Sequence, residues 1–203
     1  IVQGDKTGDK PLSDVVKEYI AEKYNKPGKV FLGVVHRLDR PTSGIVVFAR
    51  TSKALERLNK MLREKTIKKT YWAVVKNPPQ NSDDTLINYL KKNPKNNKST
   101  AFSKETKETK RAVLHYKTIT KSDHYTLLEI DLETGRHHQI RCQLANIGSP
   151  IKGDLKYGFN RSNKNGGIHL LARKIEFIHP VKKEKIVLTA DVPGGDVIWN
   201  FLK

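Results

Sequence analysis

The apolar segments of this chain are all short, and their length constrains the fold more than any other sequence feature. None approaches the roughly 20 residues that a membrane-spanning helix requires. The most apolar ones, V-F-L-G-V-V at 30–35, I-V-V-F-A at 45–49 and T-Y-W-A-V-V at 70–75, have the length of buried strands. Apolar and polar residues alternate at 112–120 and 124–132, which predicts two further strands. We therefore expect a fold dominated by β-strands, with no segment in a membrane.

Helical spacing of apolar residues occurs in three places: 13–24, a segment capped by Thr51 or Ser52, and 137–147. Ser13 is the expected N-cap of the first helix. A short helix near 196–202 is also predicted. The residues expected on the apolar faces of the three helices are Val15, Val16, Tyr19 and Ile20; Leu55, Leu58, Met61 and Leu62; and Ile140, Leu144 and Ile147.

These elements do not follow the regular β-α-β alternation of a parallel sheet. With further strands at 173–179 and 185–191, the pattern predicts an α+β fold, a central mixed, mostly antiparallel β-sheet flanked by helices and loops. We expect a single domain over 1–203. The stretch 76–110, rich in Lys, Asn, Pro, Ser and Thr, is expected to be a basic arm or hairpin insertion within it, the alternative being a solvated loop.

The charge of the chain favours a polyanionic partner. Lys and Arg number 39 against 21 Asp and Glu, which gives +18 at pH 7, spread along the chain. Nucleic acid is the partner that such a field favours most, although a lysine-rich solubilising surface is the alternative. The single cysteine, Cys142, excludes an intramolecular disulfide, and the first residues lack a signal-peptide core, so we expect a cytoplasmic protein. Because the first residue is not methionine, we expect that the chain is a fragment of a longer protein.

The segment H-R-L-D-R-P-T-S-G at 36–44 has the most distinctive chemistry in the sequence. It lies between two predicted strands, where a turn presents side chains at a sheet edge. Asp39 has Arg37 and Arg40 within two residues, and neighbouring cations keep a carboxylate ionised. Such a carboxylate can act as a nucleophile or as a base. The alternative is that Asp39 caps a turn while the arginines point into solvent.

A second polar segment, E-T-G-R-H-H-Q-I-R at 133–141, precedes and begins the helix predicted at 137–147. The planar guanidinium groups of Arg136 and Arg141 are suited to bind phosphates or to pair with a carboxylate. A helix N-terminus also favours anions. His137 and His138 are expected to be ordinary polar surface residues.

Tyr71 follows Lys68 and Lys69 on the strand predicted at 70–75. An aromatic ring in such a basic setting can stack on an unpaired RNA base, the alternative being a core tyrosine. Tyr71 and Trp72 should point to opposite faces of the sheet.

We expect no metal centre and no cofactor. The histidines show no ligand pair at a recognised metal spacing such as H-E-x-x-H. The sequence also lacks a phosphate-binding P-loop and a dinucleotide-binding glycine fingerprint.

Taken together, these segments resemble the RluA-type family of RNA pseudouridine synthases. Four motifs occur in the family's order and spacing across nearly the whole chain. They are G-V-V-H-R-L-D-R-P-T-S-G at 33–44, K-K-T-Y at 68–71, T-G-R-H-H-Q-I-R at 134–141 and G-S-P-I-K-G-D-L-K-Y-G at 148–158. The resemblance implies a pseudouridine synthase catalytic fold and an isomerase that converts specific uridines of structured ribosomal or transfer RNA to pseudouridine. It implies no cofactor and no metal, and we expect a monomer.

The resemblance also implies roles for individual residues. Asp39 is the matching catalytic aspartate, Arg141 pairs with its carboxylate, and Tyr71 stacks on the target base. Arg37 matches the position that fills the gap left by the flipped uridine, and Ile140 supplies an apolar wall under the base. His36, Arg40 and Arg136 are expected to contact or help flip the RNA.

Three features depart from the family's usual pattern. No S4-like RNA-binding domain fits in this chain, Cys142-Gln143 stands where Val-His is common, and His137 stands where Thr is common. These departures affect RNA selectivity more than the chemistry.

Two other functions remain open from the residues alone. A non-catalytic RNA-binding assembly factor would tolerate Asp39→Asn. The other is a glycosidase or nuclease that acts on nucleic acid with Asp39. A retaining glycosidase usually needs a second nearby carboxylate, and none is obvious beside Asp39 in the sequence.

Overall fold

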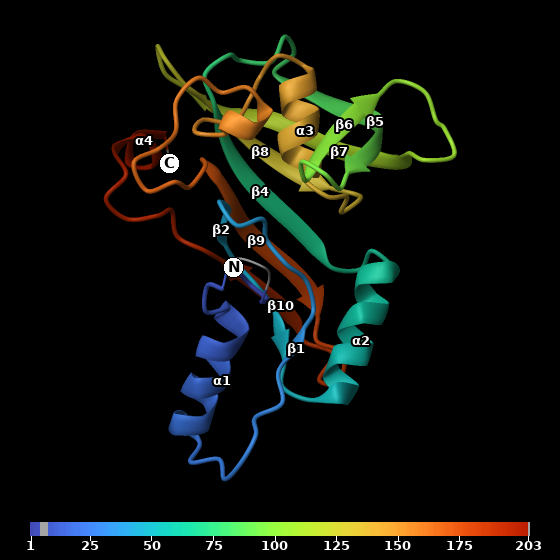
Figure 1. The fold of residues 1–203 in the computed structure, drawn as a ribbon, viewed down its shortest axis with the longest axis vertical. Helices are drawn as coiled ribbons and strands as arrows, with labels where there is room; N and C mark the ends of the chain where they lie inside the picture. Colours follow the sequence, from blue (N-terminus) through green and yellow to red (C-terminus); the bar gives the residue numbers. More distant parts are fainter. Residues whose placement is uncertain (5–7, 203) are drawn as a thin grey trace.

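The computed structural model describes residues 1–4 and 8–202, and most of its strands form one mixed sheet (Figure 1). The strand order is β10-β9-β4-β8-β7-β5-β6, with every neighbouring pair antiparallel, and β2 pairs in parallel with β9. This arrangement confirms the predicted α+β fold. The strands are β2 (Ser43–Gly44), β4 (Lys68–Val75), β5 (Asp83–Asn93), β6 (Lys98–Phe102), β7 (Lys110–Lys121), β8 (Thr126–Leu132), β9 (Leu170–Ile178) and β10 (Lys185–Thr189).

The strands predicted at 30–35 and 45–49 are much shorter in the structure. Only β1 (Gly33–Val34) and β3 (Phe48–Ala49) pair, as a separate two-stranded sheet. Next to this pair the amide of Val35 donates to the carbonyl of Val47 at 3.4 Å, but the amide of Val47 donates to the ring Nε2 of His36 at 3.2 Å and not to a backbone carbonyl. Beyond this point the chain leaves the small sheet as the loop that contains Asp39.

The first helix, α1 (Leu12–Lys23), differs from its prediction. Ser13 is not its N-cap, because the helix begins after Pro11 and Ser13 is buried within it. The amides of Leu12 and Ser13 donate instead to the carbonyls of Ile1 and Val2, so the backbone satisfies this end of the helix. The predicted apolar face is only partly buried: Ile20 is buried, but Val15 and Tyr19 are exposed.

The second helix, α2 (Ser52–Arg63), confirms its prediction. The side chain of Thr51 accepts a hydrogen bond from the amide of Ala54 at 3.1 Å, as an N-cap does. Leu58 is buried, and Leu55, Met61 and Leu62 pack on the same cluster, together with Ile175 of β9. The helix thereby fixes β1 and β3 against the lower end of the main sheet (Figure 1).

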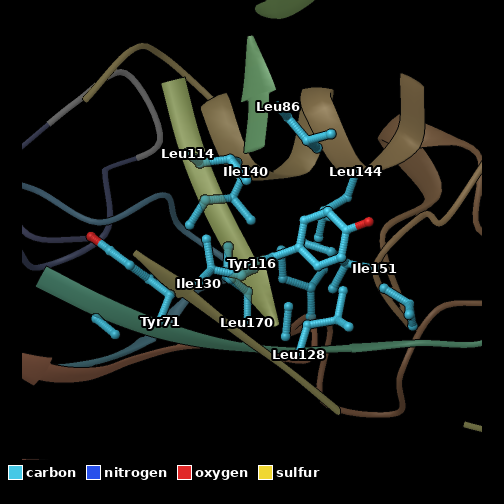
Figure 2. Close-up of a cluster of buried hydrophobic side chains, with 14 residues drawn as sticks. Tyr71, Leu86, Leu114, Tyr116, Leu128, Ile130, Ile140, Leu144, Ile151 and Leu170 are labelled. Carbon is cyan, nitrogen blue, oxygen red and sulfur yellow. The ribbon is translucent and has the colours of Figure 1, made fainter. Parts of the chain in front are cut away.

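The two faces of β4 support two separate clusters. Tyr71, Ala73 and Val75 point to the face covered by α3 (Gln139–Asn146), where Ile140 and Leu144 are buried (Figure 2). On the opposite face, Val74 and Trp72 pack against α4 (Val197–Leu202). The prediction that Tyr71 and Trp72 face opposite sides is confirmed, as is the burial of Ile140 and Leu144, whereas Ile147 is 37% exposed.

The segment 76–110 contributes an edge to the main sheet. Strands β5 and β6 form an antiparallel hairpin with a turn at 94–97, and β5 also pairs with β7 along eight residues. The register places Lys92 opposite Ser99. The hairpin lies beside α3 (Figure 1), so its residues border the side of the sheet where the polar motifs meet.

Candidate active site

The three polar segments of the sequence line one cleft of ≈ 630 Å³. The loop 36–42 forms one wall, β4 forms the floor, and residues 135–141 form the opposite wall. The residues that the sequence predicted as site residues, His36, Arg37, Asp39, Arg40, Tyr71, Arg136, Ile140 and Arg141, all line it. Lys92 and Asn97 of the β5–β6 hairpin border the same cleft.

The loop that contains Asp39 is fastened at several points. The amide of Thr42 donates to the carbonyl of Asp39 at 2.9 Å, and the carbonyl of Pro41 accepts from the amide of Ile168 at 2.9 Å. Gly44 has a φ of +115°, and a Cβ there would lie 2.4 Å from the carbonyl oxygen of Ala172 in β9. Only glycine allows this close approach, which explains the last residue of the 36–44 motif.

Arg141 connects Asp39 to a second, buried carboxylate. Its Nη1 donates to Oδ2 of Asp39 at 3.2 Å, while its Nε and Nη2 donate to Oδ2 and Oδ1 of Asp154 at 2.7 and 2.8 Å. Arg141 is 4% exposed and Asp154 1%. Burial alone would lower the pKa of the guanidinium, but the hydrogen bonds and charges of the two carboxylates outweigh it and raise the pKa. The two-pronged contact with Asp154 fixes the guanidinium plane, and with it the direction from which Arg141 reaches Asp39.

Tyr71 lies at the edge of the core, 8% exposed. Figure 2 shows its hydroxyl pointing away from the other labelled side chains of the cluster. Burial, and then the charge of Asp39, raise the pKa of Tyr71 to about 12, so the phenol stays neutral at pH 7. A neutral ring beside an ionised carboxylate can both stack on a base and donate a hydrogen bond.

His138 contradicts the expectation of a surface histidine. It is 8% exposed and has a left-handed backbone, with φ 53° and ψ 28°, directly before α3. The helix therefore begins at Gln139, two residues later than predicted. The ring Nδ1 of His138 lies 3.0 Å from the hydroxyl of Tyr157, and its Nε2 lies 3.8 Å from Oδ2 of Asp39. Burial, followed by the charge of Arg141, lowers the pKa of His138 to about 3, so the ring is neutral.

The other predicted site residues differ in how firmly they are held. Burial, and then the charge of Lys69, lower the pKa of His36 to about 4, and its ring accepts from the Val47 amide, so it stabilises the loop. Arg40 forms a 2.6 Å ion pair with Asp9, and the Nε of Arg136 donates to the carbonyl of Arg111 at 2.9 Å. Arg37 is exposed at the cleft.

Sequence reasoning missed four residues of the site. Asp154 and Tyr157 lie in the quoted motif at 148–158, but no pattern there indicated their contacts. Ser99 lies in the β5–β6 hairpin, and its amide donates a hydrogen bond to the Tyr157 hydroxyl at 2.8 Å. Lys69 lines the cleft half-buried, burial lowers its pKa, and its side chain forms no hydrogen bond or ion pair with another described residue.

Within residues 1–4 and 8–202, no group of three or more His, Cys, Asp or Glu side chains is placed to hold a metal ion. No helix in that part of the chain is long and apolar enough to span a membrane.

Comparison with known proteins gives the same assignment as the motifs. The family model for RNA pseudouridylate synthase matches residues 2–146. The tRNA pseudouridine synthase C of Vibrio parahaemolyticus is 31% identical over 186 residues, covering 83% of this chain and 74% of that protein. The ribosomal large subunit pseudouridine synthase C of Buchnera aphidicola is 36% identical over 173 residues, covering 81% of this chain and 54% of that protein. The chain belongs to the RluA-type family of RNA pseudouridine synthases.

A solved structure shows the same fold. Human RNA Pseudouridylate Synthase Domain Containing 4 superposes with a TM-score of 0.76 at 21% identity, covering 96% of this chain and 88% of that one. The chain spans about half the length of many of the curated relatives that it matches.

Proposed function

We propose that this chain is the catalytic part of an RNA pseudouridine synthase that isomerises specific uridines in structured ribosomal or transfer RNA. The observation that carries the proposal is the chain of contacts from Asp39 through Arg141 to Asp154, set in a cleft with Tyr71 as its floor. An oriented carboxylate beside an aromatic ring is the chemistry that the reaction needs. The names of relatives that act on transfer RNA and on the ribosomal large subunit support both RNA classes as substrates.

The reaction breaks the bond between C1′ of the ribose and N1 of uracil and joins C1′ to C5 of the same base. N1 gains a proton and C5 loses one, so the product is an isomer and no redox partner is required. Asp39 can begin it by attacking the sugar carbon or the base ring, or by removing a ribose proton. In each case the hydrogen bond from Arg141 keeps the carboxylate oriented.

The target base must leave its stack to reach Asp39, at a cost of a few kcal/mol. The ring of Tyr71 and the side chain of Ile140 offer it a stacking surface and an apolar wall. We assign to Arg37, which is exposed at the cleft, the role of filling the vacated space in the RNA. These contacts offset the unstacking cost, and the basic surface supplies most of the affinity.

Replacing Tyr71 tests the stacking role. Tyr71→Phe keeps the ring and should retain most of kcat/KM, whereas Tyr71→Ala should lose roughly 10- to 100-fold, the value of one base–aromatic stack. Because alanine also leaves a cavity in the core, Tyr71→Leu serves as the control that fills most of the volume without stacking. If Phe and Leu lose activity equally, the hydroxyl rather than the ring is what the reaction uses.

The β5–β6 hairpin should bind the RNA backbone. Replacing Lys92 and Lys95 with glutamine should weaken RNA binding at every sequence and reduce the slope of log K against log salt by about 1 per lost phosphate contact. Filter binding across a salt series measures both. The matched control replaces Lys182 and Lys183, in the β9–β10 connection. An equal loss in both double variants would mean that only total charge matters.

We also propose, from the sequence, that the enzyme acts in the cytoplasm as a monomer without a cofactor. Light scattering on the purified protein, with and without RNA, tests the oligomeric state.

The proposed function itself is tested by tritium release from RNA labelled at C5 of uracil. Release from a ribosomal or transfer RNA pool by the purified chain is the expected result, and mapping the modified uridine then names the substrate. Tight RNA binding without release from any pool would instead favour the non-catalytic RNA-binding factor.

A further inference from the structure

The hydrogen bonds around Tyr157 determine which nitrogen of His138 carries the proton. The Tyr157 hydroxyl accepts from the amide of Ser99 at 2.8 Å, so its own proton is free to point to Nδ1 of His138, 3.0 Å away. Burial raises the pKa of Tyr157 to about 12, which keeps that proton in place. A neutral imidazole that accepts at Nδ1 carries its hydrogen on Nε2.

On this tautomer, the Nε2–H group of His138, which lines the cleft, lies beside Asp39. It has no hydrogen-bond acceptor within bonding distance among the described residues, and its nearest acidic atom is Oδ2 of Asp39 at 3.8 Å. The same Oδ2 receives the hydrogen bond from Arg141 at 3.2 Å. No described residue donates a hydrogen bond to Oδ1 of Asp39. The two donors therefore lie on one side of the carboxylate.

The backbone conformation of His138 shows that surrounding contacts hold its ring beside Asp39. A non-glycine residue with a φ of 53° is strained by about 1 kcal/mol or more. The ring of His137 stacks on that of His138 at 3.8 Å between centroids, and the hydroxyl of Ser99 bonds to the carbonyl of His137 at 2.7 Å. These contacts stabilise the left-handed turn and aim the imidazole at Asp39.

We propose that Tyr157 and His138 form a positioning pair for the isomerase. Tyr157 fixes the Nε2–H tautomer of His138. This neutral Nε2–H group donates a hydrogen bond to Oδ2 of Asp39 and leaves Oδ1 as the reacting oxygen. The inference rests on the proposed function. Hydrogen bonds at active sites are often long without substrate and shorten in the complex, and the 3.8 Å separation fits such a contact. A neutral donor orients the carboxylate without protonating it, and Arg141 already supplies the positive charge.

Substitutions at His138 separate this role from a structural one. The side-chain amide of glutamine places a donor near the position of Nε2 and has no tautomers, so His138→Gln should retain most of kcat. His138→Ala should lower kcat about 100-fold, the effect of a misaimed reacting group, with KM for RNA changed less than about 3-fold. The matched control is His124→Gln, in the β7–β8 connection, which should match the wild type.

Tyr157→Phe tests whether the tyrosine acts through the histidine. In the wild-type background it should lower kcat roughly 10-fold, because Nδ1 loses its donor and the proton can move to it. In the His138→Gln background it should cause no further loss. An additive loss in the double variant would mean that Tyr157 acts independently of the tautomer, and the positioning pair would be wrong.

The tautomer itself can be measured without activity. Long-range ¹H–¹⁵N correlation spectra of the ¹⁵N-labelled protein should show a pyrrole-like Nε2 and a pyridine-like Nδ1 for His138, and Tyr157→Phe should change that pattern. A protonated Nδ1 in the wild type, or equal loss of kcat in folded His138→Gln and His138→Ala, would overturn the proposal. Absence of tritium release by the wild type would overturn the proposed function but leave the spectra interpretable.

Discussion

Asp39→Asn should reduce turnover to below about one-thousandth of the wild-type value, while RNA affinity should stay within about 2-fold. The amide cannot act as a nucleophile or a base, and losses of this size follow removal of such a group. Folding should tolerate the change, because Arg141 keeps its two hydrogen bonds to Asp154 and stays paired. Single-turnover tritium release and filter binding on the same preparation measure the two effects.

The matched control for this variant is Asp83→Asn, which makes the same chemical change at an exposed position of β5. It should turn over like the wild type. If Asp39→Asn loses RNA binding along with turnover, Asp39 is structural. If it keeps both, the carboxylate of Asp39 has no part in the chemistry.

Asp154→Asn gives the largest expected loss of stability. Removing one partner of a buried ion pair leaves an uncompensated charge, and this costs about 3–5 kcal/mol. Both groups are almost fully buried, at 1% and 4% exposure, so solvent does not screen the loss. For a chain of 203 residues, the expected fall in Tm is roughly 10 °C. In addition, the side-chain NH₂ of asparagine and the guanidinium of Arg141 are both hydrogen-bond donors, so they cannot bond to each other.

Activity should fall in the same variant even below its Tm. Without the two-pronged contact, the guanidinium plane of Arg141 can rotate, and its hydrogen bond to Asp39 loses its direction. Calorimetry and kcat at 20 °C separate the two losses. The control is Glu18→Gln, which removes the exposed 2.6 Å ion pair with Lys10 and should leave Tm unchanged. An unchanged Tm in Asp154→Asn would show that the buried pair is not an anchor.

Asp39→Asn and Asp154→Asn separate the chemical end of the contact chain from its structural end. Asp39 is 28% exposed at its side chain and faces the cleft, whereas Asp154 is enclosed. The carboxylate that reacts must reach the RNA, and the carboxylate that anchors Arg141 must exclude water. We therefore expect opposite results, with Asp39→Asn folded and inactive, and Asp154→Asn destabilised.

Local periodicity correctly predicted the elements whose own side chains determine how they cap and pack. Helix α2 matched its prediction because its cap and apolar face are both encoded within twelve residues. Helix α1 did not, because the amides of Leu12 and Ser13 bond to the carbonyls of Ile1 and Val2, and because Val15 and Tyr19 are exposed. The strands at 30–35 and 45–49 were too long in the prediction, since the His36 ring replaces a backbone acceptor.

The sequence by itself determined the class of fold and the residues that line the cleft. Short apolar segments must pair as strands, and the 33–44 and 134–141 motifs carried the carboxylate and the guanidinium. Only the tertiary structure decided which groups meet. Arg141 reaches Asp39 across 102 residues, and Asp154 and Tyr157 contribute through contacts that no spacing in the chain reveals. The physical reason is that periodicity records which face of an element is buried, whereas the partners of a buried polar group depend on how separate elements pack.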